Sequence, residues 1–154
     1  MSRAGRQWLW FLLIGLGLTP ASLPAQDELQ KARSQPDPVK RARLALAIAE
    51  HAAFRASEAC PSGDYEACNF LLDELQASLE LTQDSLDRSG IDPNRSPRHF
   101  KDAEIRTRKI LRQLEAFRPH LHPEDRSHFE SVLRRVSEIN DKLLSAIMTR
   151  RKKK

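Results

Sequence analysis

Aromatic side chains are scarce in this sequence and unevenly placed. The 154 residues include two tryptophans, one tyrosine and six phenylalanines, and both tryptophans, Trp8 and Trp10, lie within the first ten positions. Beyond residue 25 the aromatic residues are Tyr65 and five phenylalanines. Sugar platforms and single-stranded nucleic-acid sites of the stacking type need exposed aromatic faces. We therefore expect neither kind of site, and we do not expect nucleic acid as a partner.

Catalytic motifs are missing as well. The sequence has no glycine-rich phosphate loop, no serine in a nucleophile elbow, and no His-Glu-x-x-His or Cys-x-x-Cys-His motif. A di-iron bundle would need Glu-x-x-His pairs, and none occurs. We predict a protein that is not an enzyme and that uses no cofactor.

The sequence has a single long hydrophobic run, and it is too short to cross a membrane. Arg3 and Arg6 precede an apolar stretch over residues 8–18, and small residues and prolines follow it. A transmembrane helix needs about 20 apolar residues, whereas a basic start, a shorter apolar run and a small-residue end are typical of a secretory signal peptide. We predict a signal peptide over residues 1–25, cleaved after Ala25 or, alternatively, after Ala21, and a periplasmic or secreted mature chain.

Positive charge is concentrated in two places. The formal net charge is +5, but the predicted signal peptide contributes two arginines and no acidic residue, which leaves +3 for the mature chain. The last five residues carry five positive charges, so residues 26–149, between the predicted signal peptide and this tail, have a net charge of −2. The domains we predict are therefore a signal peptide over residues 1–25, a helical domain over 26–149 and a basic tail over 150–154. The high isoelectric point does not indicate a nucleic-acid-binding body.

The two cysteines, Cys60 and Cys68, stand on either side of a Pro-Ser-Gly-Asp turn. An exported chain meets an oxidising compartment, where such a pair forms a disulfide. A redox motif would need Cys-x-x-Cys spacing, and two sulfurs do not complete a zinc site. We predict a structural disulfide.

Four segments after residue 36 have apolar residues at helical spacing, and almost nothing alternates as a strand does. The fold class we predict is all-α: an antiparallel four-helix bundle with near-heptad, coiled-coil-like spacing, or two packed helical hairpins. Short connections would make successive helices antiparallel neighbours. An apolar helix face can be buried within one chain or between chains, so the pattern leaves the oligomeric state open. The predicted core stripes are Val39, Ala42, Leu46, Ala49, Ala53, Ala56 and Cys60, widened by Leu44 and Ile48; Cys68, Leu72, Leu75, Leu79, Thr82 and Leu86; Phe100, Ala103, Thr107, Ile110, Leu114 and Phe117; and Phe129, Val132, Val136, Ile139, Leu143 and Ile147.

Capping residues and prolines predict the ends of these helices. A short lead of one or two turns over residues 27–33 precedes a helix that begins near Asp37 and ends before Pro61. Asp64 is expected to cap the second helix. The third is expected to begin with Ser96 as its cap, and the fourth near Pro123.

The stretch Gly63-Asp64-Tyr65-Glu66, followed by Cys68, Leu72 and Leu75, resembles the second half of a tetratricopeptide repeat hairpin. The resemblance covers residues 52–81, but Ala52 and Arg55 stand where that repeat has large residues, and no second copy follows 34 residues later. It implies a similar helix-turn-helix geometry without membership of the family. The whole pattern is also similar to uncharacterised exported helical proteins of bacteria, which implies no activity.

Two basic clusters are candidate contacts for an anion or for an acidic partner, because arginine and lysine pair with carboxylates and phosphates. Alternatively, the cations of the third helix complement the acidic first two helices or face solvent, and the tail is a solubilising terminus. The candidate residues are Arg95, Arg98, Lys101, Arg106, Arg108 and Lys109 in and before the third helix, and Arg150, Arg151, Lys152, Lys153 and Lys154 in the tail.

Histidines are the third candidate feature. His120, His122 and His128 lie near Glu124 and Asp125, a donor set that suits zinc, copper or nickel. The same residues are also typical of a turn and the start of a helix.

These features together predict a non-enzymatic exported module that binds another envelope protein. The first alternative is a peripheral binder of an anionic membrane or envelope polymer, held by the basic tail and the third helix. The second alternative is a metal-binding bundle.

Overall fold

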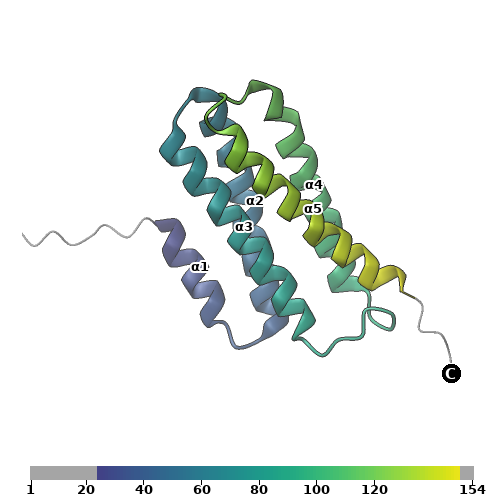
Figure 1. Cartoon of the computed structure of the whole chain (residues 1–154). Coiled ribbons are helices and arrows are strands. Elements are labelled where there is room, and N and C mark those ends of the chain that lie inside the picture. The colour runs from purple at the N-terminus through teal and green to yellow at the C-terminus, as the bar shows by residue number, and fades with distance from the viewer. Residues whose placement is uncertain (1–23, 150–154) are drawn as a thin grey trace, which may run out of the picture.

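The computed structural model describes residues 24–149, and this part of the chain is helical (Figure 1). The described residues contain no strand, so the predicted all-α class is confirmed. Most of the predicted signal peptide and the whole tail over residues 150–154 lie outside the described residues. The elements are α1 (Pro24–Ser34), α2 (Pro38–Ser62), α3 (Tyr65–Asp87), α4 (Arg98–Phe117), the short 3₁₀ turn η1 (Arg118–His120) and α5 (Arg126–Met148).

The helices form two hairpins that pack face to face. α2 pairs with α3 over most of its length, and α4 pairs with α5. α4 also lies against α2, and α5 against α3, whereas α3 and α4 barely touch (Figure 1). Of the two predicted architectures, the structure therefore has the packed hairpins.

Contacts between the hairpins show that α2 and α4 run in the same direction. Arg106 binds Glu50, and about two turns further along both helices the Gln113 amide donates to the Ser57 hydroxyl. The prediction that all successive helices are neighbours is wrong for α3 and α4. The connection over residues 88–97 is long enough to cross the end of the hairpin, so α4 packs on α2 instead of on α3.

The first helix, α1, is longer than the predicted one or two turns and covers one side of the first hairpin. It packs against α2 and, to a lesser extent, against α3. Leu29 and Ala32 are its buried residues among those whose side chains are described. Its attachment to the rest of the fold is therefore narrow.

The helix starts follow the predicted capping at two positions. Oδ1 of Asp37 accepts hydrogen bonds from the backbone N–H groups of Val39 at 2.8 Å and Lys40 at 3.2 Å. Oδ1 of Asp64 accepts one from the N–H of Ala67 at 3.1 Å. Each carboxylate satisfies amide groups that have no partner inside the helix, which fixes where α2 and α3 begin.

Three predicted helix ends are wrong. α2 continues through Pro61 because a proline in the last turn removes only one late hydrogen bond and its fixed φ suits a helix. Ser96 does not act as a side-chain cap for α4. α5 begins three residues after Pro123, because a backbone hydrogen bond from the N–H of Asp125 to the carbonyl of His122 first closes a turn.

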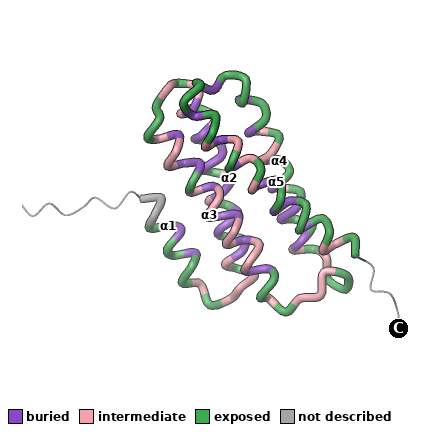
Figure 2. The backbone as a smooth tube through the Cα atoms, viewed as in Figure 1, coloured by how far each residue is buried: buried purple, intermediate pink, exposed green. Residues whose placement is uncertain are grey.

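The core lies between the two hairpins, where buried residues of α2 to α5 face one another (Figure 2). The stripes predicted for the helices now labelled α3 and α4 are buried at every position. In α5 the predicted stripe is buried except at Ile147, which is half-buried. Helical periodicity therefore identified the core side of these three helices.

The stripe predicted for α2 needs one correction. Leu44 does not widen the core, because 46% of it is exposed. Ala45 and Ala52 are buried instead, and Val39 and Ile48 are half-buried. Because α2 contacts both α3 and α4, its buried face is wide enough to include Ala45 and Ala52, whereas Leu44 lies outside both contacts.

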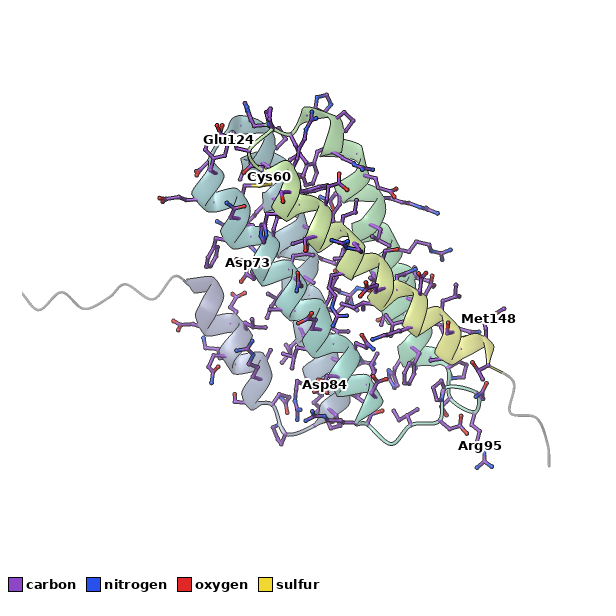
Figure 3. The ribbon with its side chains drawn as sticks, in the orientation of Figure 1. Cys60, Asp73, Asp84, Arg95, Glu124 and Met148 are labelled. Atoms are coloured by element: carbon purple, nitrogen blue, oxygen red, sulfur yellow. A yellow bond between two sulfur atoms is a disulfide. The ribbon has the colours of Figure 1, made fainter. Side chains whose placement is uncertain are left out.

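A disulfide joins Cys60 and Cys68, as predicted, and both residues are completely buried. It ties the last turn of α2 to the first turn of α3 at one end of the molecule (Figure 3). None of the described helices is long and apolar enough to span a membrane.

Candidate functional site

The basic residues predicted on the third helix lie on and before α4. Arg106 is half-buried, and Arg95 lies in the preceding loop with its Nε 3.9 Å from a carboxylate oxygen of Asp92. Of the predicted cations on the helix, Arg98, Lys101, Arg108 and Lys109 are exposed. The structure therefore brings most of the predicted cations together on one helix.

Two of the arginines on α4 itself are held by acidic partners. Nη2 of Arg106 lies 2.6 Å from Oε2 of Glu50 and its Nε donates to Oε1 at 2.9 Å, so the guanidinium binds the α2 carboxylate with two hydrogen bonds. Asp102 lies 3.5 Å from the same guanidinium. Arg108 pairs with Glu104 at 3.3 Å along α4.

The contact between Arg106 and Glu50 perturbs both groups. Hydrogen bonding to Arg106 is the largest cause that holds the pKa of Glu50 below its usual value, and burial opposes it. The same hydrogen bonding raises the pKa of the guanidinium. Both groups are therefore charged at neutral pH, and the pair joins the two hairpins.

An open groove with a volume of about 970 Å³ runs beside this ion pair, between α2 and the start of α4. We call it the α2–α4 groove. Its lining combines basic, apolar and small side chains: Arg43, Ala47, Ser96, Pro97, Arg98, His99, Lys101, Asp102, Ile105 and Arg106.

Ile105 is the largest aliphatic residue in the α2–α4 groove, and 54% of it is exposed. Arg43, Arg98 and Lys101 form no ion pair with any residue that the structure describes. The groove therefore offers uncompensated positive charge beside exposed apolar surface, a combination suited to an acidic ligand that also has apolar groups.

The contribution of α2 to this groove was missed in the sequence. Arg43 and Ala47 line the groove and Glu50 binds Arg106 beside it, but all three lie in an alanine-rich helix about 50 to 60 positions before the cations of α4. Their spacing of four and three residues does place them on one helix face. That face becomes a candidate only once α4 is known to pack on α2.

The end of α5 and the start of α4 lie at the same end of the molecule. Figure 3 shows Met148, the last residue of α5, and Arg95, in the loop before α4, toward the same end of the molecule. The tail candidates Arg150, Arg151, Lys152, Lys153 and Lys154 follow α5 directly, outside the described residues. The opposite end carries the disulfide and the loop with Glu124 (Figure 3).

The histidines predicted as metal ligands lie at that opposite end, but they make separate contacts. The ring of His122 packs edge-on against Tyr65, with centroids 5.9 Å apart. Nε2 of His128 lies 3.0 Å from Oδ1 of Asp73 on α3, without the geometry of a hydrogen bond. His120 is exposed in η1.

No group of three or more histidine, cysteine or acidic side chains in the described residues could hold a metal ion. Asp125, beside His122 and His128, is only 2% exposed, and Oδ2 of its carboxylate has no hydrogen-bond partner. Burial raises its pKa, and the two histidines oppose that shift. The metal-binding alternative thus stays a prediction from sequence that this geometry does not support.

A second hollow, of about 550 Å³, lies between α1 and α3. Phe70, Asp73 and Glu74 line it from α3, and Asp27 and Arg33 line it from α1. Burial raises the pKa of Glu74, against the attraction of nearby positive charge. Its walls carry both charge signs, so it lacks the one-sided charge of the α2–α4 groove.

Comparison of the chain with protein-family models, with curated proteins and with solved structures finds no match.

Proposed function

We propose that this chain is an exported, non-enzymatic helical module that binds another protein of the cell envelope. The observation that carries the proposal is the α2–α4 groove, where Ile105 is exposed beside Arg43, Arg98 and Lys101, three cations with no ion-pair partner among the described residues. Exposed apolar side chains with charged neighbours are a feature of protein-binding surfaces. The antiparallel α2–α3 hairpin is also the kind of geometry that the resemblance to a tetratricopeptide repeat implies.

Export is supported by the basic and apolar pattern of residues 1–25 and by the Cys60–Cys68 disulfide. The test is to express the full chain in bacteria with a C-terminal tag and to measure the intact mass of the exported product. We expect a mature chain that begins at Gln26, or at Ser22 if cleavage follows Ala21. A full-length product retained in the cytoplasm would refute export.

The binding role is tested by pull-down of the tagged mature chain from the envelope fraction. We expect one partner in near-stoichiometric amount. Recovery of the bait alone at low salt, where charge-driven contacts are strongest, would contradict the role.

A second candidate function is attachment to an anionic membrane or envelope polymer. It is supported by the end of α5 at Met148, after which the basic tail follows in sequence, because Met148 and the loop before α4 lie toward the same end of the molecule. Each basic residue near an anionic bilayer contributes about 1 kcal/mol at best, so the tail and α4 would have to act together. Co-sedimentation with phosphatidylglycerol vesicles that falls on deletion of residues 150–154 and at high salt would support it. Sedimentation unchanged by both treatments would rule it out.

A further inference from the structure

We infer that the α2–α4 groove binds an acidic protein segment that inserts an apolar side chain beside Ile105. This inference rests on the proposed binding function and assigns it a place and a ligand chemistry. It is drawn from three properties of the groove: its uncompensated charge, its apolar surface and its length.

The charge of the groove is positive because Asp102, the carboxylate that lines it, already lies against the Arg106 guanidinium. Arg106 holds Glu50 with two hydrogen bonds and lies 3.5 Å from Asp102. Arg43, Arg98 and Lys101 line the same groove without a described ion-pair partner. An incoming carboxylate would therefore meet two or three cations that hold no carboxylate within residues 24–149, and it would not displace the pair between Arg106 and Glu50.

The apolar surface distinguishes a protein segment from a simple polyanion. Ile105 is exposed over 54% of its surface, and the small Ala47 of α2 lines the same groove. A phosphate-rich polymer or lipid headgroup gains little from such a contact. A peptide with a leucine, valine or phenylalanine next to its carboxylates would bury this surface as well as pair with the cations.

The length of the groove suits a short segment. Arg98 and Arg106 are eight residues apart on α4, which at 1.5 Å per residue corresponds to about 12 Å. That span matches about two turns of a helix or four residues of extended chain. We therefore expect a segment of this size that carries at least two acidic residues and one apolar residue.

The experiment places a photo-crosslinking amino acid at position 105 of the full chain in the cells that produce it. A second variant of this chain carries the crosslinker at position 144 as a control, because Leu144 is also exposed but lies on α5. The crosslinked products are digested, and the captured partner segment is sequenced by mass spectrometry. The charge variant is R98E/K101E, and its matched control is R134E/K142E, which reverses two exposed cations on α5.

The expected result is capture at position 105 of an acidic protein segment with an apolar residue. Capture should be lost in R98E/K101E and kept in R134E/K142E, with equal helical circular dichroism for both variants. A synthetic peptide with the captured sequence should then bind R98E/K101E about tenfold more weakly than wild type.

Other outcomes separate the two levels of the proposal. Capture of a protein at position 144 but not at 105 would overturn the groove and leave the binding function standing. Capture of lipid or polymer at position 105 would overturn the acidic segment in favour of surface attachment. No capture at either position, together with a pull-down that recovers only the bait, would overturn both.

Discussion

Arg106 of α4 links the two hairpins by charge through Glu50 of α2, as Arg135 of α5 does through Glu80 of α3. About 27% of the Arg106 side chain is exposed and 36% of that of Glu50, so the pair is neither fully buried nor fully solvated. A two-pronged contact between guanidinium and carboxylate fixes the relative position of α2 and α4 more firmly than a lysine would. The same contact occupies Glu50, which leaves the nearby groove positive.

The first prediction concerns Glu50→Gln. Removal of this carboxylate should lower the free energy of unfolding at pH 7 by about 0.5 to 1.5 kcal/mol. Since the folded pKa of Glu50 is lowered by Arg106, its stabilisation is present above the unfolded pKa of glutamate, about 4.3. It is lost as the pH falls through the lowered folded pKa.

Urea unfolding of wild type and Glu50→Gln at pH 7 and again at about pH 2.5 measures this difference. We expect a gap at pH 7 that narrows in acid. Glu138→Gln, which breaks an exposed contact with Arg135 within α5, serves as the matched control and should change stability less. Equal stability of Glu50→Gln and wild type at pH 7 would show that the pair does not join the hairpins energetically.

The α2 helix is distinguished at the element scale by its small side chains. Ala49 and Ala53 are completely buried, where α2 meets α3 and α4. Small residues allow helix backbones to approach closely, and added volume at such positions must displace a neighbour. The alanine stripe therefore sets how tightly both hairpins pack.

The second prediction is that Ala49→Leu destabilises the protein by about 1 to 3 kcal/mol through overpacking. Ala47→Leu is the matched control, because Ala47 lies on the same helix but is exposed, and it should change stability by less than about 0.5 kcal/mol. Thermal unfolding followed by circular dichroism compares the two. Equal melting temperatures for both variants would mean that the stripe is not tightly packed.

The third prediction concerns the disulfide between α2 and α3. The two cysteines are separated by eight positions in sequence. Without the disulfide the unfolded chain gains conformational freedom, so the free energy of unfolding should fall by about 2 to 3 kcal/mol. We expect reductant to lower the melting temperature of the wild-type protein. The Cys60→Ala/Cys68→Ala variant should have a lower melting temperature than wild type, and reductant should not change it. A wild-type melting temperature that reductant also leaves unchanged would contradict a stabilising role of the disulfide.

At the scale of the whole molecule, the helices differ in how firmly they are held. α2 and α3 share the most extensive interface and a covalent link, whereas α1 is anchored chiefly by Leu29 and Ala32. Segments with few buried apolar contacts open locally at lower free energy than the core. The molecule should therefore unfold from its N-terminal helix inward.

The fourth prediction is that hydrogen exchange at neutral pH is fastest in α1. We expect its amides to exchange at least about tenfold faster than those in the middle of α2 and α3. Mass spectrometry of deuterated peptides resolves these segments. Equal protection of α1 and α2 would show that α1 is an integral part of the cooperative core.

The sequence alone determined the class of fold, the buried face of three helices and the disulfide. These features depend on short-range information: apolar spacing of three and four residues, capping by Asp37 and Asp64, and two cysteines around one turn. The helix ends near Pro61 and Pro123 were not predicted correctly, because the chain at a proline can either continue as a helix, as α2 does, or form a turn first, as it does before α5. The candidate cations of α4 were visible in the sequence as a local concentration of arginine and lysine.

Only the tertiary structure decided which helices become neighbours. Helical periodicity records that a face is buried but not which helix buries it, so it could not choose between a bundle and two packed hairpins. Once α4 packs on α2, Arg106 meets Glu50, Leu44 is left outside, and Ile105 comes beside Arg43 and Ala47. The candidate site is made of residues about 55 positions apart, and for that reason it exists only in the folded chain.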